Sequence, residues 1–304
     1  MSLIKQPNEI IVEKTLKCLI YGQAGTGKST LALSAPKPLL LDFDGGAKRL
    51  NAEHKVPTVQ IHDWKEVSEV LKEDLSPFET IVVDTVGKMI DFIISDVCGL
   101  NNPRIQDWGK INVEFSQFCR KLNELKKNII FVAHRDNRKE GDNNVFIPAI
   151  REKNYNTIVT ELDLMGYIES KNGQRVITFD FSDRNDGKNT CNLPQFIQIP
   201  TIVDAKGKVI ADNNFFEKGI MKGFSDRLSA QVKLTEDYQA ECKNIDEMLD
   251  MCEDAEGVNM FMEKVMLSKD YKHILSSKMY AKAGLLKKVK ELGLSYNKVS
   301  SKYE

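Results

Sequence analysis

The sequence has no apolar run long enough to cross a membrane. A membrane-spanning helix needs about 18 or more consecutive apolar residues, and no such run occurs in the 304-residue chain. Residues 1–7 also lack the apolar segment of a secretory signal. These absences predict a soluble protein with no membrane among its partners.

Paired cysteines and clustered histidines are also missing. The six cysteines are scattered without CxxC spacing, and the four histidines are isolated from one another. This pattern predicts free thiols in a reducing cytoplasm and argues against a disulfide framework or a zinc cage. The only metal that we expect is one that a bound nucleotide brings.

Neither sign of charge is in excess. The formal net charge is −1, which gives no general attraction to nucleic acid. The charges are nevertheless unevenly distributed, because residues 235–256 hold nine acids and one lysine, whereas residues 264–304 hold ten lysines and three acids. Solvated faces of helices explain such a pattern, and a partner-binding surface is the alternative.

The chain does contain a regular alternation of short apolar runs and amphipathic helical patterns. This alternation predicts an α/β fold with a mostly parallel sheet that helices cover on both faces. In such sheets, ligands bind at the carboxyl ends of the strands. The predicted strands are 16–21, 39–42, 58–61, 80–84 and 128–133, and the predicted helices are 28–34, 64–75, 89–97 and 113–125.

The pattern changes after residue 160 and becomes helical after residue 228. We predict a core of residues 1–225 with a β-rich extension over about 160–222, and a helical C-terminal region of residues 226–304. The further predicted strands are 163–169, 175–181, 196–199 and 208–210, and the predicted helical segments are 245–252, 258–266 and 280–292.

A glycine-rich segment between the first strand and the first helix fits the pattern G-x-x-x-x-G-K-[ST]. Its glycines let the backbone wrap around a phosphate, and its N–H groups supply positive potential. Lys28 is predicted to reach the β- and γ-phosphates, and Ser29 to bind Mg²⁺. The flanking strand and helix argue against a chance turn. The predicted nucleotide-binding residues are Gly22, Gln23, Ala24, Gly25, Thr26, Gly27, Lys28, Ser29 and Thr30.

Carboxylates end two of the predicted strands. Asp84 is predicted to hold Mg²⁺, directly or through water, and a helix-capping role is the alternative. Asp42 and Asp44 end another strand beside paired glycines. Of these two, we predict that Asp44 deprotonates the attacking water, whereas Asp42 is a candidate structural cap.

His134 ends the last central strand, on the same predicted edge as the glycine-rich segment. A histidine there can donate a hydrogen bond to a γ-phosphate and transmit the loss of that phosphate to the adjoining loop. A purely structural histidine is the alternative. The predicted catalytic residues are therefore Lys28, Asp44, Asp84 and His134.

Two predicted loops combine cations with polar residues that suit a single-stranded nucleic acid. The first is 101–110 and includes an aromatic ring, and the second is 135–144, directly after His134. Both loops also contain acids, and an ordinary surface loop is the alternative for each. The candidate DNA-binding residues are Arg104, Trp108, Lys110, Arg135, Arg138 and Lys139.

Four segments in this order, GQAGTGKST, LLLDFDGG, TIVVDT and NIIFVAHRD, resemble the RecA-like core of phage ATP-binding proteins of the single-strand annealing or recombination type. The resemblance covers about residues 10–200. It implies ATP as the nucleotide, a water-activating acid at Asp44, a γ-phosphate sensor at His134, and DNA contacts in the two loops. Asp44 replaces a glutamate of that family.

Residues 187–194 resemble a RecA segment, K-N-K-x-x-x-P, in which lysines reach the ATP of a neighbouring subunit. Lys188, Asn189 and Pro194 match this pattern, but Thr190 replaces the second lysine. The resemblance therefore implies a homo-oligomer with Lys188 as a trans-acting residue. The C-terminal helical region matches no pattern of that family.

The leading hypothesis is a DNA-stimulated ATPase that acts on single-stranded DNA in phage recombination, annealing or repair. It implies a cytoplasmic protein, encoded by a phage or a prophage, that works beside replication or recombination proteins. A helicase loader or assembly ATPase with a protein partner is the alternative. A small-molecule or nucleotide kinase and a non-hydrolysing switch are the remaining hypotheses.

Overall fold

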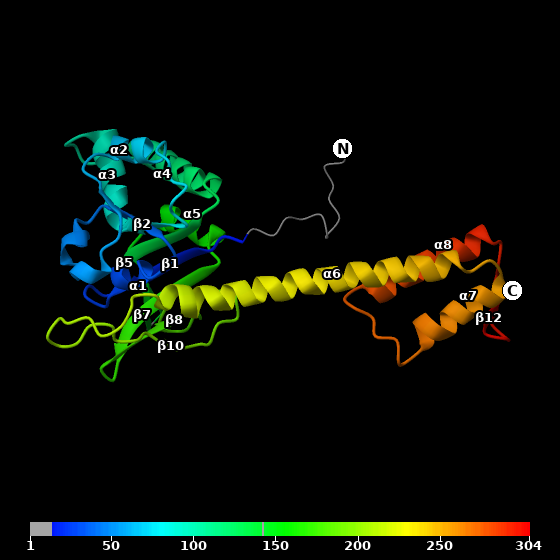
Figure 1. Ribbon diagram of the computed structural model, residues 1–304. Helices are drawn as coiled ribbons and strands as arrows, with labels where there is room; N and C mark the ends of the chain where they lie inside the picture. Colours follow the sequence, from blue (N-terminus) through cyan, green and yellow to red (C-terminus); the bar gives the residue numbers. More distant parts are fainter. Residues whose placement is uncertain (1–13, 142) are drawn as a thin grey trace. The chain divides into compact units, whose positions relative to one another are not determined.

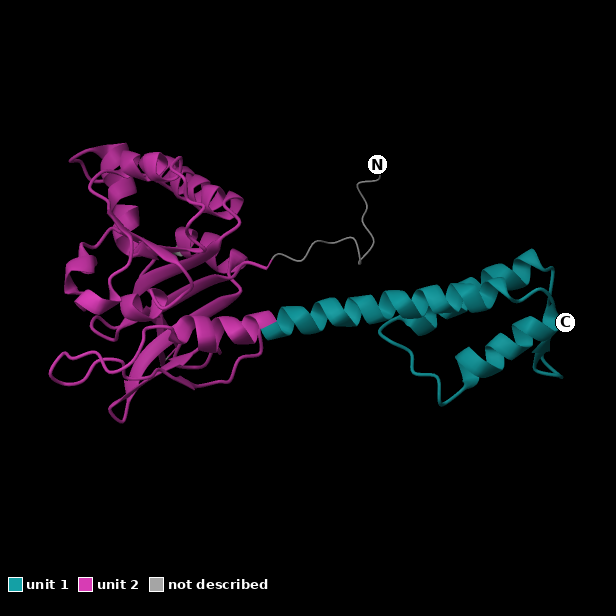
Figure 2. Cartoon of the chain, in the orientation of Figure 1, with its two compact units in different colours: residues 1–13, 226–304 teal, residues 14–225 magenta. Residues whose placement is uncertain are grey.

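The computed structural model describes residues 14–141 and 143–304. Residues 1–13, which belong to the predicted core and for which no secretory signal is expected, lie outside the described residues. The chain divides into two compact units, Lys14–Ser225 and a second unit that contains Asp226–Glu304 (Figure 2). The division falls within the long helix α6, Lys222–Asp250, so that no irregular linker separates the two units along the chain.

The first unit is built on one large sheet with the strand order β10-β8-β7-β1-β5-β4-β2-β3 (Figure 1). The six strands from β7 to β3 run parallel, and β8 and β10 are antiparallel additions at one edge. The predicted mostly parallel α/β fold is therefore confirmed. The strands in this order are β1 (Lys17–Gly22), β2 (Pro38–Asp42), β3 (Thr58–Gln60), β4 (Thr80–Asp84), β5 (Asn128–Glu140), β7 (Leu164–Lys171), β8 (Gln174–Thr178) and β10 (Ile197–Gln198). Two further strands of the sheet, β6 (Asn143–Pro148) and β9 (Lys188–Asn189), pair with β5 and β7.

Both faces of the central strands are buried because their sequences are almost continuously apolar. On one face, Leu19, Val83 and Phe131 pack in a cluster with Met89 and Phe115 from the covering helices. On the other face, the alternate residues of the same strands, such as Ile20 and Val82, are also fully buried. The helices of this unit are α1 (Lys28–Ala32), α2 (Trp64–Val70), α3 (Val86–Cys98), α4 (Asp107–Glu124) and α5 (Glu152–Glu161).

Two predicted loops have regular structure instead. Strand β5 continues beyond the predicted 128–133 to Glu140 and pairs with β6 (Asn143–Pro148), so that the described residues of 135–144, all but 142, belong to a β-hairpin. Helix α4 begins at Asp107, which places Trp108 and Lys110 on a helix and not in the loop that we predicted. In the first segment the backbone forms the start of α4, and in the second it forms the β5–β6 pairing. The local polar composition reveals neither of these hydrogen-bond patterns.

Other differences lie in the predicted β-rich extension. Its first strand, β7, belongs to the central sheet and pairs with β1. Residues 208–210, predicted as a strand, contribute only an isolated bridge between Val203 and Val209. Helix α5 was not predicted, although Tyr155, Ile158 and Leu162 have the spacing of a helix face and pack on the core.

The C-terminal unit has its own hydrophobic cluster. Ile245 and Leu249 from the end of α6 pack with residues of the three following helical segments, including Val258 and Leu285. Asp254 caps the first of these segments by accepting a hydrogen bond from the Gly257 N–H. The segments are α7 (Ala255–Phe261), the π-helical turn η5 (Met262–Leu267) and α8 (Ser277–Glu291), followed by the short strands β11 (Tyr296–Asn297) and β12 (Lys302–Tyr303).

Candidate functional site

The strand register brings the predicted site residues to one edge of the sheet. Gly22 at the end of β1 pairs with His134 on β5, and Asp42 at the end of β2 pairs with Asp84 at the end of β4. Strand β5 lies between β1 and β4. This inserted strand places His134 between the glycine-rich loop and Asp84, an arrangement that sequence order alone does not reveal.

The glycine-rich loop needs glycine for two different reasons. Gly27 has φ +84°, in the left-handed region that favours glycine. A Cβ on Gly22 would lie 2.5 Å from the Ile168 carbonyl oxygen on β7, so that a larger residue would push the loop off the sheet. The loop thus turns tightly at the end of β1, and its backbone N–H groups form a concave surface suited to phosphate.

Lys28 is folded back into this loop. Its side chain is buried, with the residue 6% exposed, and Nζ donates a hydrogen bond to the Gln23 carbonyl oxygen at 2.8 Å. Burial lowers the pKa of the Lys28 ammonium, and the negative charges of Asp84 and Asp44 act in the opposite direction. The Lys28 ammonium therefore lies near both carboxylates and is held by a single carbonyl oxygen among the described residues.

Asp84 has the properties of a cation ligand. The residue is 5% exposed, and burial raises the pKa of its carboxyl group to about 6, with a smaller contribution from Asp42 and Asp44. A hydrogen bond with the Ser29 side chain and the charge of Lys28 oppose the shift. A crowded, buried carboxylate beside a hydroxyl is stabilised by a divalent cation, so that the donor set fits Mg²⁺.

The helix-capping alternative for Asp84 has no support. Helix α3 is capped by the next residue, Thr85, whose hydroxyl accepts a hydrogen bond from the Lys88 N–H at 3.4 Å. Asp84 itself remains available at the end of β4 for a metal ion.

The neighbouring carboxylates Asp42 and Asp44 differ in role. Asp42 is buried, and its two oxygens accept hydrogen bonds from the Gly46 and Ala47 N–H groups at 2.9 and 3.0 Å, which makes it a structural cap. Asp44 is more exposed and forms an ion pair with Arg49 at 2.7 Å. Its charge also acts on Lys28, Asp84 and His134.

His134 on β5 pairs with Gly22, where the loop begins. Partial burial lowers the pKa of its imidazole, the cationic Lys28 adds to that shift, and Asp44 opposes it. The lowered pKa favours the neutral imidazole, which has one N–H to donate.

Arg175, on β8, was not predicted to belong to the site. Its guanidinium lies directly against Gly27, where a Cβ would collide with it, and Nη2 donates a hydrogen bond to the Pro200 carbonyl oxygen at 3.3 Å. No local signal marks this arginine, because its place depends on the antiparallel pairing of β8 with β7. A small pocket beside it is lined by Gly27, Thr30, Leu31, Ile199, Pro200, Ile202, Asn213 and Phe215.

Lys188 is engaged within its own chain. Its Nζ donates hydrogen bonds to the Val159 and Thr160 carbonyl oxygens, at 2.8 and 3.3 Å, near the end of α5. The Asn189 amide likewise bonds Asp180 and the Leu193 carbonyl. In this conformation the segment fastens α5 to the sheet, and the Lys188 ammonium is not free to reach another subunit.

The first candidate DNA segment offers cations but no free ring. The Arg151 guanidinium lies over the Trp108 ring, 3.9 Å from its centroid, so that this face of the indole is already covered. Arg104 and Lys110 are exposed. A stacking role for Trp108 would require that Arg151 moves away.

In the second candidate segment, two of the three cations are internally bound. The Arg135 guanidinium bonds the Tyr167 hydroxyl at 3.1 Å and lies over the Phe146 ring. Arg138 forms ion pairs with Glu140 and Asp186. Lys139 is exposed and has no hydrogen-bond or ion-pair partner among the described residues. The β5–β6 hairpin thus presents one unengaged cation.

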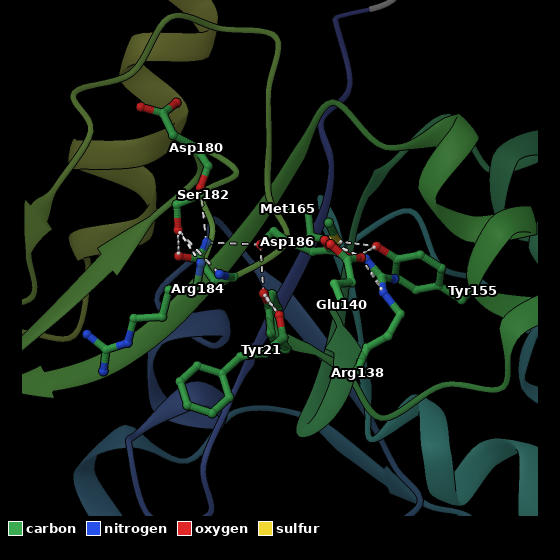
Figure 3. A network of polar contacts seen from close by, with 11 residues as sticks. Tyr21, Arg138, Glu140, Tyr155, Met165, Asp180, Ser182, Arg184 and Asp186 are labelled. Atoms are coloured by element: carbon green, nitrogen blue, oxygen red, sulfur yellow. Dashed lines mark hydrogen bonds and ion pairs between the residues drawn. The ribbon is translucent and has the colours of Figure 1, made fainter. Parts of the chain in front are cut away.

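Arg138 belongs to a polar network that links the hairpin to the nucleotide-binding strand (Figure 3). Asp186 accepts hydrogen bonds from Arg138 at 3.2 Å and from the Tyr155 hydroxyl at 2.6 Å. The Tyr21 hydroxyl donates to the Asp186 and Phe146 carbonyl oxygens. Tyr21 directly precedes the glycine-rich loop, so that the network connects the loop, the hairpin and α5.

Comparison with known proteins places the core in a family. Residues 14–191, more than half of the chain, match a protein-family model described as an AAA domain. The crystal structure of the flagellar accessory protein FlaH from Methanocaldococcus jannaschii is similar with a TM-score of 0.38 at 11% identity, and the match covers 67% of this chain and 92% of that one. No curated protein matches the sequence.

Proposed function

The chain belongs to the AAA domain family of P-loop nucleotide-binding proteins, and from this premise we propose that it is a RecA-like ATPase that hydrolyses ATP with Mg²⁺ and acts on single-stranded DNA. The observation that supports hydrolysis is the convergence of Lys28, Ser29 and Asp84, with Asp44 and His134 beside them. A buried lysine, a metal-binding pair and a carboxylate that orients water are groups that γ-phosphate cleavage uses, and an imidazole can donate a hydrogen bond to the γ-phosphate.

Each residue has a distinct role in this proposal. Lys28 binds the β- and γ-phosphates, and Ser29 and Asp84 hold Mg²⁺, which neutralises charge on the phosphates when bound. Asp44 orients and deprotonates the attacking water. His134 donates its N–H to the γ-phosphate and loses that partner after cleavage.

Arg175 is assigned to the nucleoside side of the site. It lies against Gly27 and adjoins the small pocket that Thr30 also lines. A guanidinium in that position can bind the α-phosphate or cover the base.

In the proposed DNA role, strand β5 connects the nucleotide site with the DNA-contacting hairpin. His134 lies on β5, and the same strand continues into the β5–β6 hairpin. Hydrogen bonds among Tyr21, Arg138 and Asp186 also join that hairpin to the strand that precedes the glycine-rich loop. Lys139 on the hairpin, with Arg104 and Lys110 on the first segment, are the exposed cations proposed to contact phosphates. Recombination, annealing or repair of phage DNA by a homo-oligomer is the process that this activity would serve.

ATP turnover with and without single-stranded DNA tests the proposal. We expect Mg²⁺-dependent release of phosphate that single-stranded DNA stimulates at low salt and that Asp84→Asn abolishes. Stimulation should fall in Lys139→Ala, with the exposed lysine Lys48→Ala as the matched control. Turnover without stimulation or DNA binding at low salt would remove the DNA role and leave the ATPase role intact.

A protein partner is the second candidate target. Leu100 and Ile105, between α3 and α4, are almost completely exposed, at 107% and 95%, and exposed apolar side chains at a loop favour protein contacts over phosphate contacts. A helicase loader or assembly ATPase fits this observation. If a Leu100→Ser, Ile105→Ser variant keeps full DNA stimulation, the two residues do not contribute to the DNA response and stay available for a protein partner; lost stimulation would assign them to DNA.

A further inference from the structure

The C-terminal unit carries opposite charges, some of which have no partner among its described residues. Its described residues form two ion pairs between lysine and an acid, Lys243 with Glu247 and Lys287 with Glu291, and each lies within a single helix. Neither pair joins the acid-rich half of the unit to the lysine-rich half. The two halves are joined instead through Glu241, which contacts His273, and Asp246, which accepts from the Tyr280 hydroxyl. Charges outside these contacts are exposed and available for an external contact.

The acidic patch lies where α6 ends and the chain turns into α7. Asp250, Glu253 and Glu256 are exposed, and their carboxylates have no hydrogen-bond or ion-pair partner in the described part of the chain. Met251 lies among them and is 80% exposed. The patch thus combines unpaired negative charge with an uncovered apolar side chain.

The basic patch lies on the outer face of α8. Lys278, Lys282, Leu286 and Lys290 recur every four residues and form one ridge along the helix. Met279 adjoins this ridge, and Met279 and Leu286 are 76% and 53% exposed. The neighbouring row of the helix, about 100° around its axis, includes Leu285 and is buried in the unit's core. The ridge therefore lies beside the buried face, and its residues are exposed.

We propose that the acidic patch of one copy of the chain binds the basic patch of a second copy. The patches have opposite charge, and each has exposed Met or Leu side chains that can form a desolvated centre. Nucleic acid fits the basic patch less well, because base stacking uses aromatic rings and the ridge presents methionine and leucine. Since both patches belong to one compact unit, the contact requires neither ATP nor the glycine-rich loop.

Sedimentation velocity of the full chain without nucleotide or DNA tests this contact. We expect concentration-dependent association at low salt that weakens as salt is added. The variant Lys282→Glu, Lys290→Glu should raise the dissociation constant about 10- to 100-fold, and Asp250→Lys, Glu253→Lys should do the same. An equimolar mixture of the two variants should associate again, because each supplies the unaltered patch that the other needs.

The control is Lys269→Glu, Lys272→Glu, which changes the same net charge at exposed positions of the same unit, outside both patches. It should associate like the unaltered chain, and circular dichroism should show that all variants are folded. The inference is overturned if the unaltered chain stays monomeric, if the Lys282 and Lys290 variant associates normally, or if the mixed variants fail to associate.

Discussion

Charged side chains are buried at the edge of the core sheet but exposed in the C-terminal unit. At the carboxyl edge of the sheet, Lys28 and Asp84 are 6% and 5% exposed, and burial shifts both of their pKa values toward the neutral form. In the C-terminal unit, the lysines of α8 other than the half-buried Lys288 are exposed, as are the acids that follow α6. Buried charges perform chemistry on one ligand, whereas exposed charges steer association.

The difference also concerns how each region is stabilised. The core brings its charges together through strands that are distant in sequence, and a ligand has to complete the arrangement. The C-terminal unit is held by an apolar cluster around residues such as Ile245 and Leu285, and its charges can change without disturbing that cluster. Substitutions in the two regions should therefore affect different properties.

The largest expected effect is the loss of turnover in Lys28→Ala. Removal of the buried ammonium takes away a charge that stabilises the transition state, and we expect ATP hydrolysis to fall about 10²- to 10³-fold. The measurement is steady-state phosphate release. Lys88→Ala is the matched control, because Lys88 is exposed and paired with Asp91. Turnover in Lys28→Ala at the unaltered rate would contradict the proposed site.

The next effect separates the stability of the two units. Leu285 is 2% exposed in the C-terminal cluster, and Leu285→Ala should lower the free energy of unfolding of that unit by about 2–5 kcal/mol. Leu286→Ala, at the exposed neighbour, should change it by less than about 0.5 kcal/mol. Urea unfolding followed by circular dichroism gives both values. A weaker ATP affinity in Leu285→Ala than in the unaltered chain would contradict the expectation that the substitution affects the C-terminal unit alone.

Asp84 predicts a dependence of stability on pH. Its folded pKa of about 6 exceeds the ordinary 3.8, so that the protonated form stabilises the fold at low pH and this contribution is lost as pH rises through 6. The shift corresponds to roughly 3 kcal/mol. Asp84→Asn should lack this loss. Urea unfolding of both proteins at pH 4 and 7, without Mg²⁺ or nucleotide, gives the comparison, and equal pH dependence would contradict the shift.

The smallest effect concerns the network in Figure 3. Asp186→Asn weakens the bonds to Arg138 and Tyr155 and should lower the free energy of unfolding by about 1–3 kcal/mol. Asp183→Asn, three residues earlier on the exposed part of the loop, is the control. Hydrogen exchange should also show faster exchange in the β5–β6 hairpin for Asp186→Asn, and unchanged exchange there would show that the network does not hold the hairpin.

Much of the site's composition was predictable from sequence, because the relevant signals are local. The glycine pattern around Lys28 defines a phosphate-binding turn within nine residues, and Asp84 and His134 each end an apolar strand. Strand ends of a parallel sheet lie on one edge, so that their convergence follows from the fold class. The alternative roles of Asp42 and Asp44, in contrast, were separated only by which backbone N–H groups each carboxylate reaches.

The predictions from sequence were wrong where the structure of a segment depends on contacts with distant parts of the chain. Polar composition predicted loops at 101–110 and 135–144, yet one enters a helix and the other is a hairpin. The Trp108 ring is covered by Arg151, which lies 43 residues later in the sequence. The trans-acting role of Lys188, by contrast, stays a prediction; in the single chain its ammonium bonds the Val159 and Thr160 carbonyl oxygens.

By itself, the sequence determined the fold class, the phosphate-binding loop and the residue types at the strand ends, because apolar periodicity and glycine chemistry act over a few neighbouring residues. The tertiary structure alone decided that β5 lies between β1 and β4, that Arg175 lies against Gly27, and which charges stay unpaired. These features depend on strand order and on partners far apart in the chain, whose contacts are set by packing of the whole unit.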